Sequence, residues 1–163
     1  MNVRKWVKQE EPDNKYGATF TLGDKHSDLP KDAIISVTRG ENFTIPRLVI
    51  NGILNQFIMK SLAKNENLIY AELTGQFQDR VGQTLTVWKD PKLMNTFRTR
   101  GFHQFSRKFF SWVFYSGRVK AYFHTWKVQS IPTSQEAEAF VVKNGRYFKG
   151  GKLLRKANHQ KID

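Results

Sequence analysis

His103, in the middle of the chain, is the residue best placed to do chemistry. It lies two residues after Gly101, within a stretch from 83 to 128 that holds more than half of the aromatic residues and a cluster of Arg and Lys. Imidazole titrates near neutral pH and ligates iron, so His103 can act as a general acid or base or as an axial haem ligand. The structural alternative is a half-buried histidine hydrogen-bonded at a helix kink. A second histidine, His124, can line the same site or be a structural residue of a strand.

Aromatic residues surround His103 in the sequence and predict an apolar site. Trp88, Phe97, Phe102 and Phe105 are candidates for the lining of a substrate pocket. Aromatic side chains at helical spacing also fill ordinary hydrophobic cores, and that alternative stays open.

Three arginines on the same stretch, Arg98, Arg100 and Arg107, are candidate cofactor-binding residues. A guanidinium group offers paired donors in a fixed fork, which suits carboxylates such as haem propionates. Arg39, at the end of an earlier β-rich run, can do the same. A solvated helix face is the other interpretation of such a cluster.

The elements that must position these residues follow from periodicity and capping signals. Asp90-Pro91 is a strong helix start, and Gly101 marks a kink, a close approach or a break in the helix that ends near Gly117. A first helix begins at Thr44. Strands are expected at 33–39, 68–77, 83–88 and 119–128, and a short helix after Pro132.

This order is β-α-β-β-α-β, which predicts a ferredoxin-like α+β fold with an antiparallel sheet and both helices on one face. We expect an N-terminal arm over 1–32, the α+β domain over 33–142 and a basic, only partly ordered C-terminal tail over 143–163. The second sheet face would expose Tyr122 and Trp126, or alternatively Phe123, in a monomer. The sequence therefore favours a homodimer, and with it a dimeric α+β barrel.

Composition limits the chemistry. The chain of 163 residues has no Cys, which excludes disulfides and thiolate chemistry, and its formal net charge of +13 favours anionic partners. No apolar stretch is long enough to span a membrane and no signal-peptide pattern opens the sequence, so we expect a cytoplasmic protein. Nucleic acid or an anionic membrane surface is a less favoured partner than a hydrophobic small molecule.

Four short motifs lie along the predicted elements: Ile-Ser-Val-Thr-Arg39, Thr-Val-Trp88, Phe97 with Gly-x-His103, and Pro-Thr-x-x-Glu136-Ala. Together they resemble the motifs of the dimeric α+β barrel superfamily, which includes the antibiotic-biosynthesis monooxygenases. The pattern is most similar to the branch of spheroidene monooxygenase and its uncharacterised relatives.

The resemblance implies oxygen-dependent chemistry on a large apolar molecule in a pocket between sheet and helices, with haem as cofactor in some branches. His103 would then be the catalytic residue, and the metal ligand if haem is bound. The haem-degrading branch carries Trp where this chain has Phe97 and its haem-ligating His where this chain has Ser106 and Arg107, so haem degradation is not expected. The alternatives are a non-catalytic module that binds a lipophilic ligand or haem, and a basic nucleic-acid-binding protein.

Overall fold

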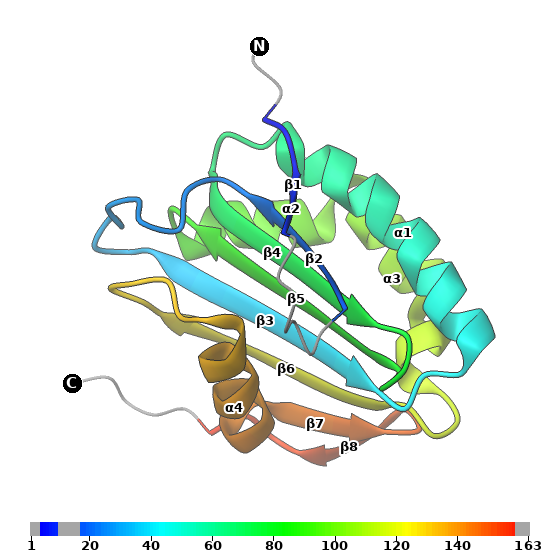
Figure 1. Cartoon of the computed structure of the whole chain (residues 1–163). Helices are drawn as coiled ribbons and strands as arrows, with labels where there is room; N and C mark the ends of the chain where they lie inside the picture. Colours follow the sequence, from blue (N-terminus) through cyan, green and yellow to red (C-terminus); the bar gives the residue numbers. More distant parts are fainter. Residues whose placement is uncertain (1–3, 10–16, 159–163) are drawn as a thin grey trace.

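The computed structural model describes residues 4–9 and 17–158, which form an eight-stranded antiparallel sheet with helices on both faces (Figure 1). The strand order is β1-β2-β4-β5-β3-β6-β7-β8. In chain order the elements are β1 (Val7–Gln9), β2 (Ala18–Leu22), β3 (Ile34–Glu41), α1 (Ile45–Ala63), β4 (Leu68–Gln76), β5 (Val81–Trp88), α2 (Pro91–Thr99), α3 (Gly101–Tyr115), β6 (Lys120–Lys127), α4 (Ser134–Asn144), β7 (Arg146–Lys149) and β8 (Lys152–Arg155).

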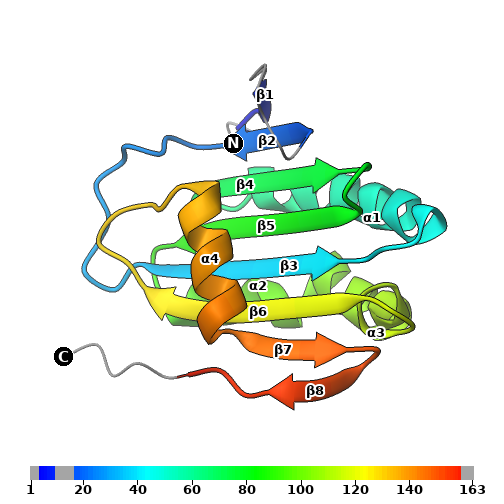
Figure 2. The ribbon, with the colours of Figure 1, turned by 60° about the horizontal axis from the view of Figure 1, so that its bottom comes forward.

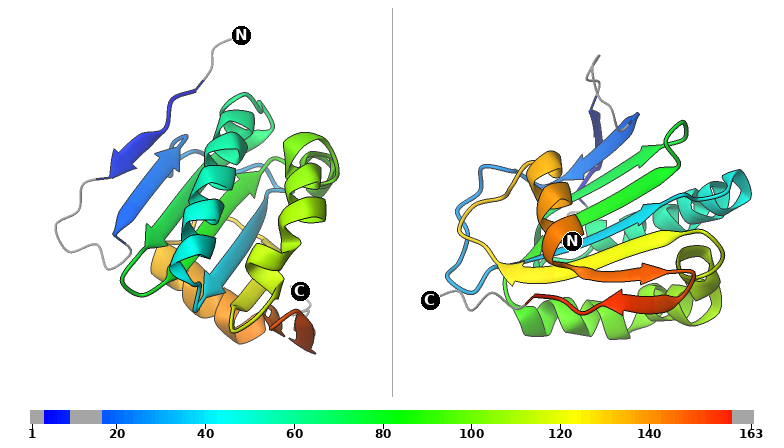
Figure 3. Two further views of the ribbon diagram at one scale, coloured as in Figure 1. Left: turned by 90° about the vertical axis from the view of Figure 1, so that its right-hand side faces the viewer. Right: turned by 90° about the horizontal axis from the view of Figure 1, so that it is seen from below.

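The centre of the molecule confirms the predicted α+β fold. Strands β4, β5, β3 and β6 are neighbours in that order, with α1 between β3 and β4 and with α2 and α3 between β5 and β6. Helices α1 and α3 lie side by side on one face of the sheet (Figure 3). The sheet forms no closed barrel within the described residues.

The second long helix is divided into α2 and α3. Asp90 begins α2 as expected, because its carboxylate accepts hydrogen bonds from the backbone N–H groups of Lys92 and Leu93. Arg100 is extended, and Gly101 has a φ of +59°, a conformation that glycine adopts without steric cost. Of the alternatives at Gly101, the structure therefore shows a break.

The opposite face of the sheet is covered by α4, which corrects the argument for a dimer. Figure 2 shows α4 crossing in front of the sheet while α1, α2 and α3 lie behind it. Ala137 and Val141 of α4 are fully buried against the sheet, and Trp126 packs on Phe140 with ring centroids 4.4 Å apart. The face predicted to be open is thus closed by the chain itself. Homodimerisation stays a prediction, but an uncovered sheet face no longer supports it.

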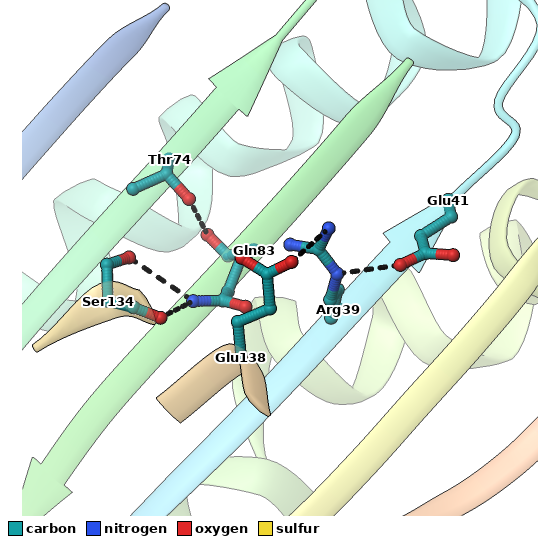
Figure 4. A network of polar contacts seen from close by, with 6 residues as sticks. All are labelled: Arg39, Glu41, Thr74, Gln83, Ser134 and Glu138. Carbon is teal, nitrogen blue, oxygen red and sulfur yellow. Dashed lines mark hydrogen bonds and ion pairs between the residues drawn. The ribbon is translucent and has the colours of Figure 1, made fainter. Parts of the chain in front are cut away.

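Polar contacts also fix α4 on the sheet (Figure 4). Arg39, only 6% exposed, bridges two carboxylates: its Nε lies 2.9 Å from Glu41 Oε1, and its Nη2 lies 3.0 Å from Glu138 Oε1 on α4. The side-chain amide of Gln83 donates to the backbone oxygen of Ser134 at the start of α4, over 3.1 Å. Arg39 therefore holds α4 on the sheet. It does not lie on the opposite face, which α1, α2 and α3 cover.

The two ends of the sheet contain strands that the sequence only partly predicts. β2, inside the predicted arm, pairs with β4, and β7 and β8 extend the sheet from β6. Residues 146–155, part of a tail expected to be only partly ordered, thus form a hairpin. Residues 159–163 of the predicted tail, with His159, lie outside the described part of the chain.

Candidate functional site

Two separate apolar clusters lie on the face of the sheet that α1, α2 and α3 cover. A cavity lies between that face and the three helices. One cluster gathers Leu62, Trp88 and Met94, and the other gathers Phe43, Val113 and Val119. A cavity of about 560 Å³ lies between the sheet and helices α1, α2 and α3. This volume falls within the range of about 300–1,000 Å³ typical of small-molecule pockets.

The floor of the cavity consists of hydroxyl-bearing residues on β3 and β5. Ser36 pairs with Thr86 and Thr38 pairs with Thr84 across the two strands, and all four line the cavity. Side chains alternate between the faces of a strand, so the same segment of β3 buries Ile35 and Val37 against α4. Small hydroxylated residues at positions that would otherwise hold large apolar core residues leave the space open.

The helices contribute further polar groups to the wall. Asn51 and Asn55 of α1 and Ser106 and Ser111 of α3 line the cavity. The side-chain oxygen of Asn51 is buried and has no hydrogen-bond partner among the described residues. A buried acceptor without a partner is unfavourable, so a ligand that donates a hydrogen bond here would be stabilised.

His103 is one of the residues that line the cavity. Its Nδ1 lies 3.3 Å from the backbone oxygen of Arg98, and its ring contacts the ring of Phe97 with centroids 5.5 Å apart. Burial lowers the pKa of His103 from 6.5 to about 4, and the nearby charges of Arg98 and Arg107 act in the same direction, although the contact with the Arg98 carbonyl opposes them. The imidazole is therefore neutral at pH 7.

This pKa has a consequence for stability that can be measured. The unfolded chain binds a proton at His103 below about pH 6.5, whereas the folded chain does so only near pH 4, so stability is lost as the pH falls through that window. We expect the free energy of unfolding of the wild type to fall by about 2 kcal/mol more than that of His103→Asn between pH 7 and 4.5. Urea unfolding at several pH values measures the difference, and parallel pH profiles would contradict it.

The cavity is electropositive. Arg98, Arg107 and Arg146 line it, and none of the Asp and Glu residues that the structure describes does. Burial lowers the pKa of Arg98, and the charges of Arg107 and Arg146 lower it further although Tyr115 acts in the opposite direction. The Arg98 guanidinium also lies 4.5 Å from the centre of the Phe123 ring. Arg107 and Arg146 are exposed, so they lie where the cavity opens to solvent.

Some predicted site residues come together and others do not. Trp88 and Phe97 line the cavity and pack on each other with ring centroids 5.1 Å apart. Phe102 and Phe105 do not line it: Phe102 packs on Phe57 of α1, and Phe105 is exposed. Arg100 is likewise exposed and is not part of the lining.

His124 is a structural residue, as the alternative interpretation proposed. It lies on the α4 face of the sheet, where its ring stacks beside both Trp126 and Phe140, with a centroid distance of 5.7 Å to each. It does not reach the cavity.

The donor set of the cavity fits haem in its chemistry. A histidine that binds a metal through one ring nitrogen commonly makes a hydrogen bond to a backbone carbonyl through the other. Nδ1 of His103 makes such a contact with the backbone oxygen of Arg98. Its low pKa keeps the ring in the neutral form that iron requires, and the arginines can pair with propionates. Among the described residues, no group of three or more His, Cys, Asp or Glu side chains could hold a metal ion by itself.

Comparison with known proteins supports the fold. No protein-family profile matches the chain, and no curated protein is similar to it in sequence. A conserved protein from Methanosarcina mazei Go1 shares 11% identity at a TM-score of 0.49, over 60% of this chain and 94% of its own. A protein of Fusobacterium nucleatum subsp. nucleatum ATCC 25586 named "Putative monooxygenase" shares 10% identity at a TM-score of 0.52, over 87% of this chain. This chain spans 58% of the length of that second protein.

None of the helices in the described ranges is long and apolar enough to cross a membrane.

Proposed function

We propose that this protein is monooxygenase-like and takes up a hydrophobic small molecule with an anionic group in the cavity under α1, α2 and α3. The observation that carries the proposal is the lining itself: aromatic side chains, three arginines and one neutral histidine, with no carboxylate. The fold shared with the Fusobacterium protein agrees with a monooxygenase-like function. The resemblance to the spheroidene monooxygenase branch points to a large apolar substrate.

Each group has a role in this proposal. Trp88, Phe97 and Met94 bury the apolar part of the ligand, and Arg98 pairs with its anionic group. His103 lies next to the bound molecule with a ring that is neutral at pH 7, so it can accept a hydrogen bond from the ligand. Haem, if bound, would supply oxygen activation, with His103 as the iron ligand and Arg98, Arg107 and Arg146 around the propionates.

Two fluorescent probes that differ mainly in charge test the binding site. We expect anilinonaphthalene sulfonate to bind more tightly than the uncharged phenylnaphthylamine. Arg98→Met should weaken the sulfonate probe about ten-fold, because a charge-assisted hydrogen bond is lost, and should leave the neutral probe nearly unchanged. Arg100→Met is the matched control, since it removes the same charge outside the cavity. Equal effects of the two substitutions on the sulfonate probe would refute the site.

Turnover is tested separately from binding. Compounds that co-purify with the protein are extracted, identified by mass spectrometry and added back in an oxygen electrode, with haemin present and absent and with and without a two-electron reductant. Ligand-dependent oxygen uptake that is lost in His103→Phe supports the monooxygenase-like activity. Ligand retention without oxygen uptake indicates a non-catalytic binding module.

A further inference from the structure

The helix layer carries an extreme asymmetry of charge. Helices α1, α2 and α3 contain no Asp or Glu, and all fourteen acidic residues of the chain lie elsewhere. The same three helices carry Arg47, Lys60, Lys92, Arg98, Arg107 and Lys108. The charged side chains of these three helices are therefore all cationic, although Asp90 caps the start of α2.

The outer surface of the layer is also apolar along its whole length. Four residues of α1 and three of α3 are large, hydrophobic and between 44% and 55% exposed. They are Ile45, Val49, Ile53, Phe57, Phe105, Phe109 and Trp112, here called the apolar face. The α1 members recur every four residues and the α3 members every three or four, so each set forms one stripe of its helix. Contacts from Phe57 to Phe102 and from Phe102 to Phe105 join the two stripes.

Cationic side chains lie directly against the rings of this face. Lys60 Nζ is 5.9 Å from the centre of the Phe57 ring, and Lys108 Nζ is 5.6 Å from that of Phe109. The Arg47 guanidinium is 5.8 Å from the ring of Trp112. Aromatic and aliphatic groups interleaved with Lys and Arg are typical of surfaces that insert into the headgroup region of anionic bilayers.

A depression lined by three arginines lies where α1 begins and α3 has just ended. Arg47, Arg80 and Arg118 line it. Arg47 also hydrogen-bonds to the Ser116 hydroxyl over 2.7 Å, which joins the two helix ends. This cluster can pair with headgroup phosphates at one end of the apolar face.

We propose that the apolar face docks on an anionic lipid bilayer. A second copy of the chain is a poorer occupant, because two such faces would bring cations together with no acidic residue on α1, α2 or α3 to pair with them. Nucleic acid would use the cations but not the aliphatic stripe of Ile45, Val49 and Ile53. Of these three occupants, only the bilayer uses both features. The inference does not depend on the ligand of the cavity, although the same helices roof it.

Vesicle flotation tests the proposal. The full chain is mixed with phosphatidylcholine vesicles that either contain or lack phosphatidylglycerol. We expect binding only to the anionic vesicles, together with a blue shift of the fluorescence of Trp112 that Trp112→Phe removes. Phe57→Ser/Phe109→Ser should weaken binding at least about ten-fold, whereas Phe77→Ser/Leu154→Ser, which removes equally exposed apolar groups elsewhere, should not.

Charge is tested in the same assay. Lys60→Gln/Lys108→Gln should weaken binding about twenty-five-fold, since each cation near an anionic surface contributes roughly a five-fold effect. Lys143→Gln/Lys152→Gln makes the same change in net charge outside the helix layer and should have a much smaller effect.

Four results would overturn the proposal. The first is equal binding to neutral and anionic vesicles. The second is equal loss in the control pairs. The third is a lipid-free dimer, detected by sedimentation equilibrium, that Phe57→Ser/Phe109→Ser dissociates, because the face would then be a self-interface. RNA binding that requires Phe57 and Phe109 while vesicles stay unbound would also exclude the bilayer.

Discussion

Glu138→Ala should lower the free energy of unfolding by about 3 kcal/mol, because it leaves the buried guanidinium of Arg39 with much less compensation. Arg39 is 6% exposed, and its two carboxylate contacts come from Glu41 on its own strand and from Glu138 on α4. Glu41 stays in place, so the expected loss is at the lower end of the range for breaking a buried ion pair. Urea unfolding should show a lower midpoint with an unchanged slope.

The control for this prediction is an ion pair of similar length in a different environment. Lys127 Nζ lies 3.2 Å from Asp32 Oδ1, but both side chains are more than half exposed. Asp32→Ala should therefore change stability by less than about 1 kcal/mol. The double variant Arg39→Met/Glu138→Leu should regain most of the loss, since it removes both charges. A loss in Glu138→Ala as small as that in Asp32→Ala would show that α4 does not depend on the pair.

The βαββαβ centre could be predicted because each element carries its own local signal. Apolar residues alternate in β3, and Asp90-Pro91 begins α2. The position of α4 had no such signal. A short helix after an irregular connection can lie on either face of a sheet, and its buried residues Ala137 and Val141 do not say which. The sequence therefore does not show that α4 covers the second face of the sheet. The prediction of a dimer rests on that face being uncovered.

The hairpin of β7 and β8 did have a signal. Gly150 and Gly151 separate two short apolar pairs, and both have positive φ, of 55° and 84°. A two-residue glycine loop between strands is typical of a tight hairpin. The many cations of this segment instead predict a basic, only partly ordered tail. Arg146, which lines the cavity, is therefore not among the predicted site residues.

The sequence places Phe102 and Phe105 in the pocket only if one continuous helix runs through Gly101. The extended Arg100 resets the phase of the helix, so α3 turns His103, Ser106 and Phe110 toward the cavity and its stripe of Phe105, Phe109 and Trp112 toward solvent. Periodicity shows which residues share a helix face, but the contacts of that face decide whether it is core or surface.

Ser106→Phe should abolish most ligand binding while leaving the protein folded. Ser106 is buried and lines the cavity, so a phenyl ring at this position fills empty space instead of displacing packed atoms. A ligand that needs this space must then displace the ring. We expect both the charged and the uncharged naphthyl probes to bind about ten- to hundred-fold more weakly, the equivalent of the about 1–3 kcal/mol that overpacking costs.

The matched control lies two turns along the same helix. Val113 is fully buried in the cluster with Phe43 and Val119 and does not line the cavity. Val113→Phe should lower the free energy of unfolding by about 1–3 kcal/mol, whereas Ser106→Phe should keep or raise it. A Ser106→Phe variant that unfolds as readily as Val113→Phe would mean that the space under α3 closes in solution. Full stability with unchanged probe binding would place the ligand outside the cavity. The pair of variants thus separates the cavity from the core by the same added side chain.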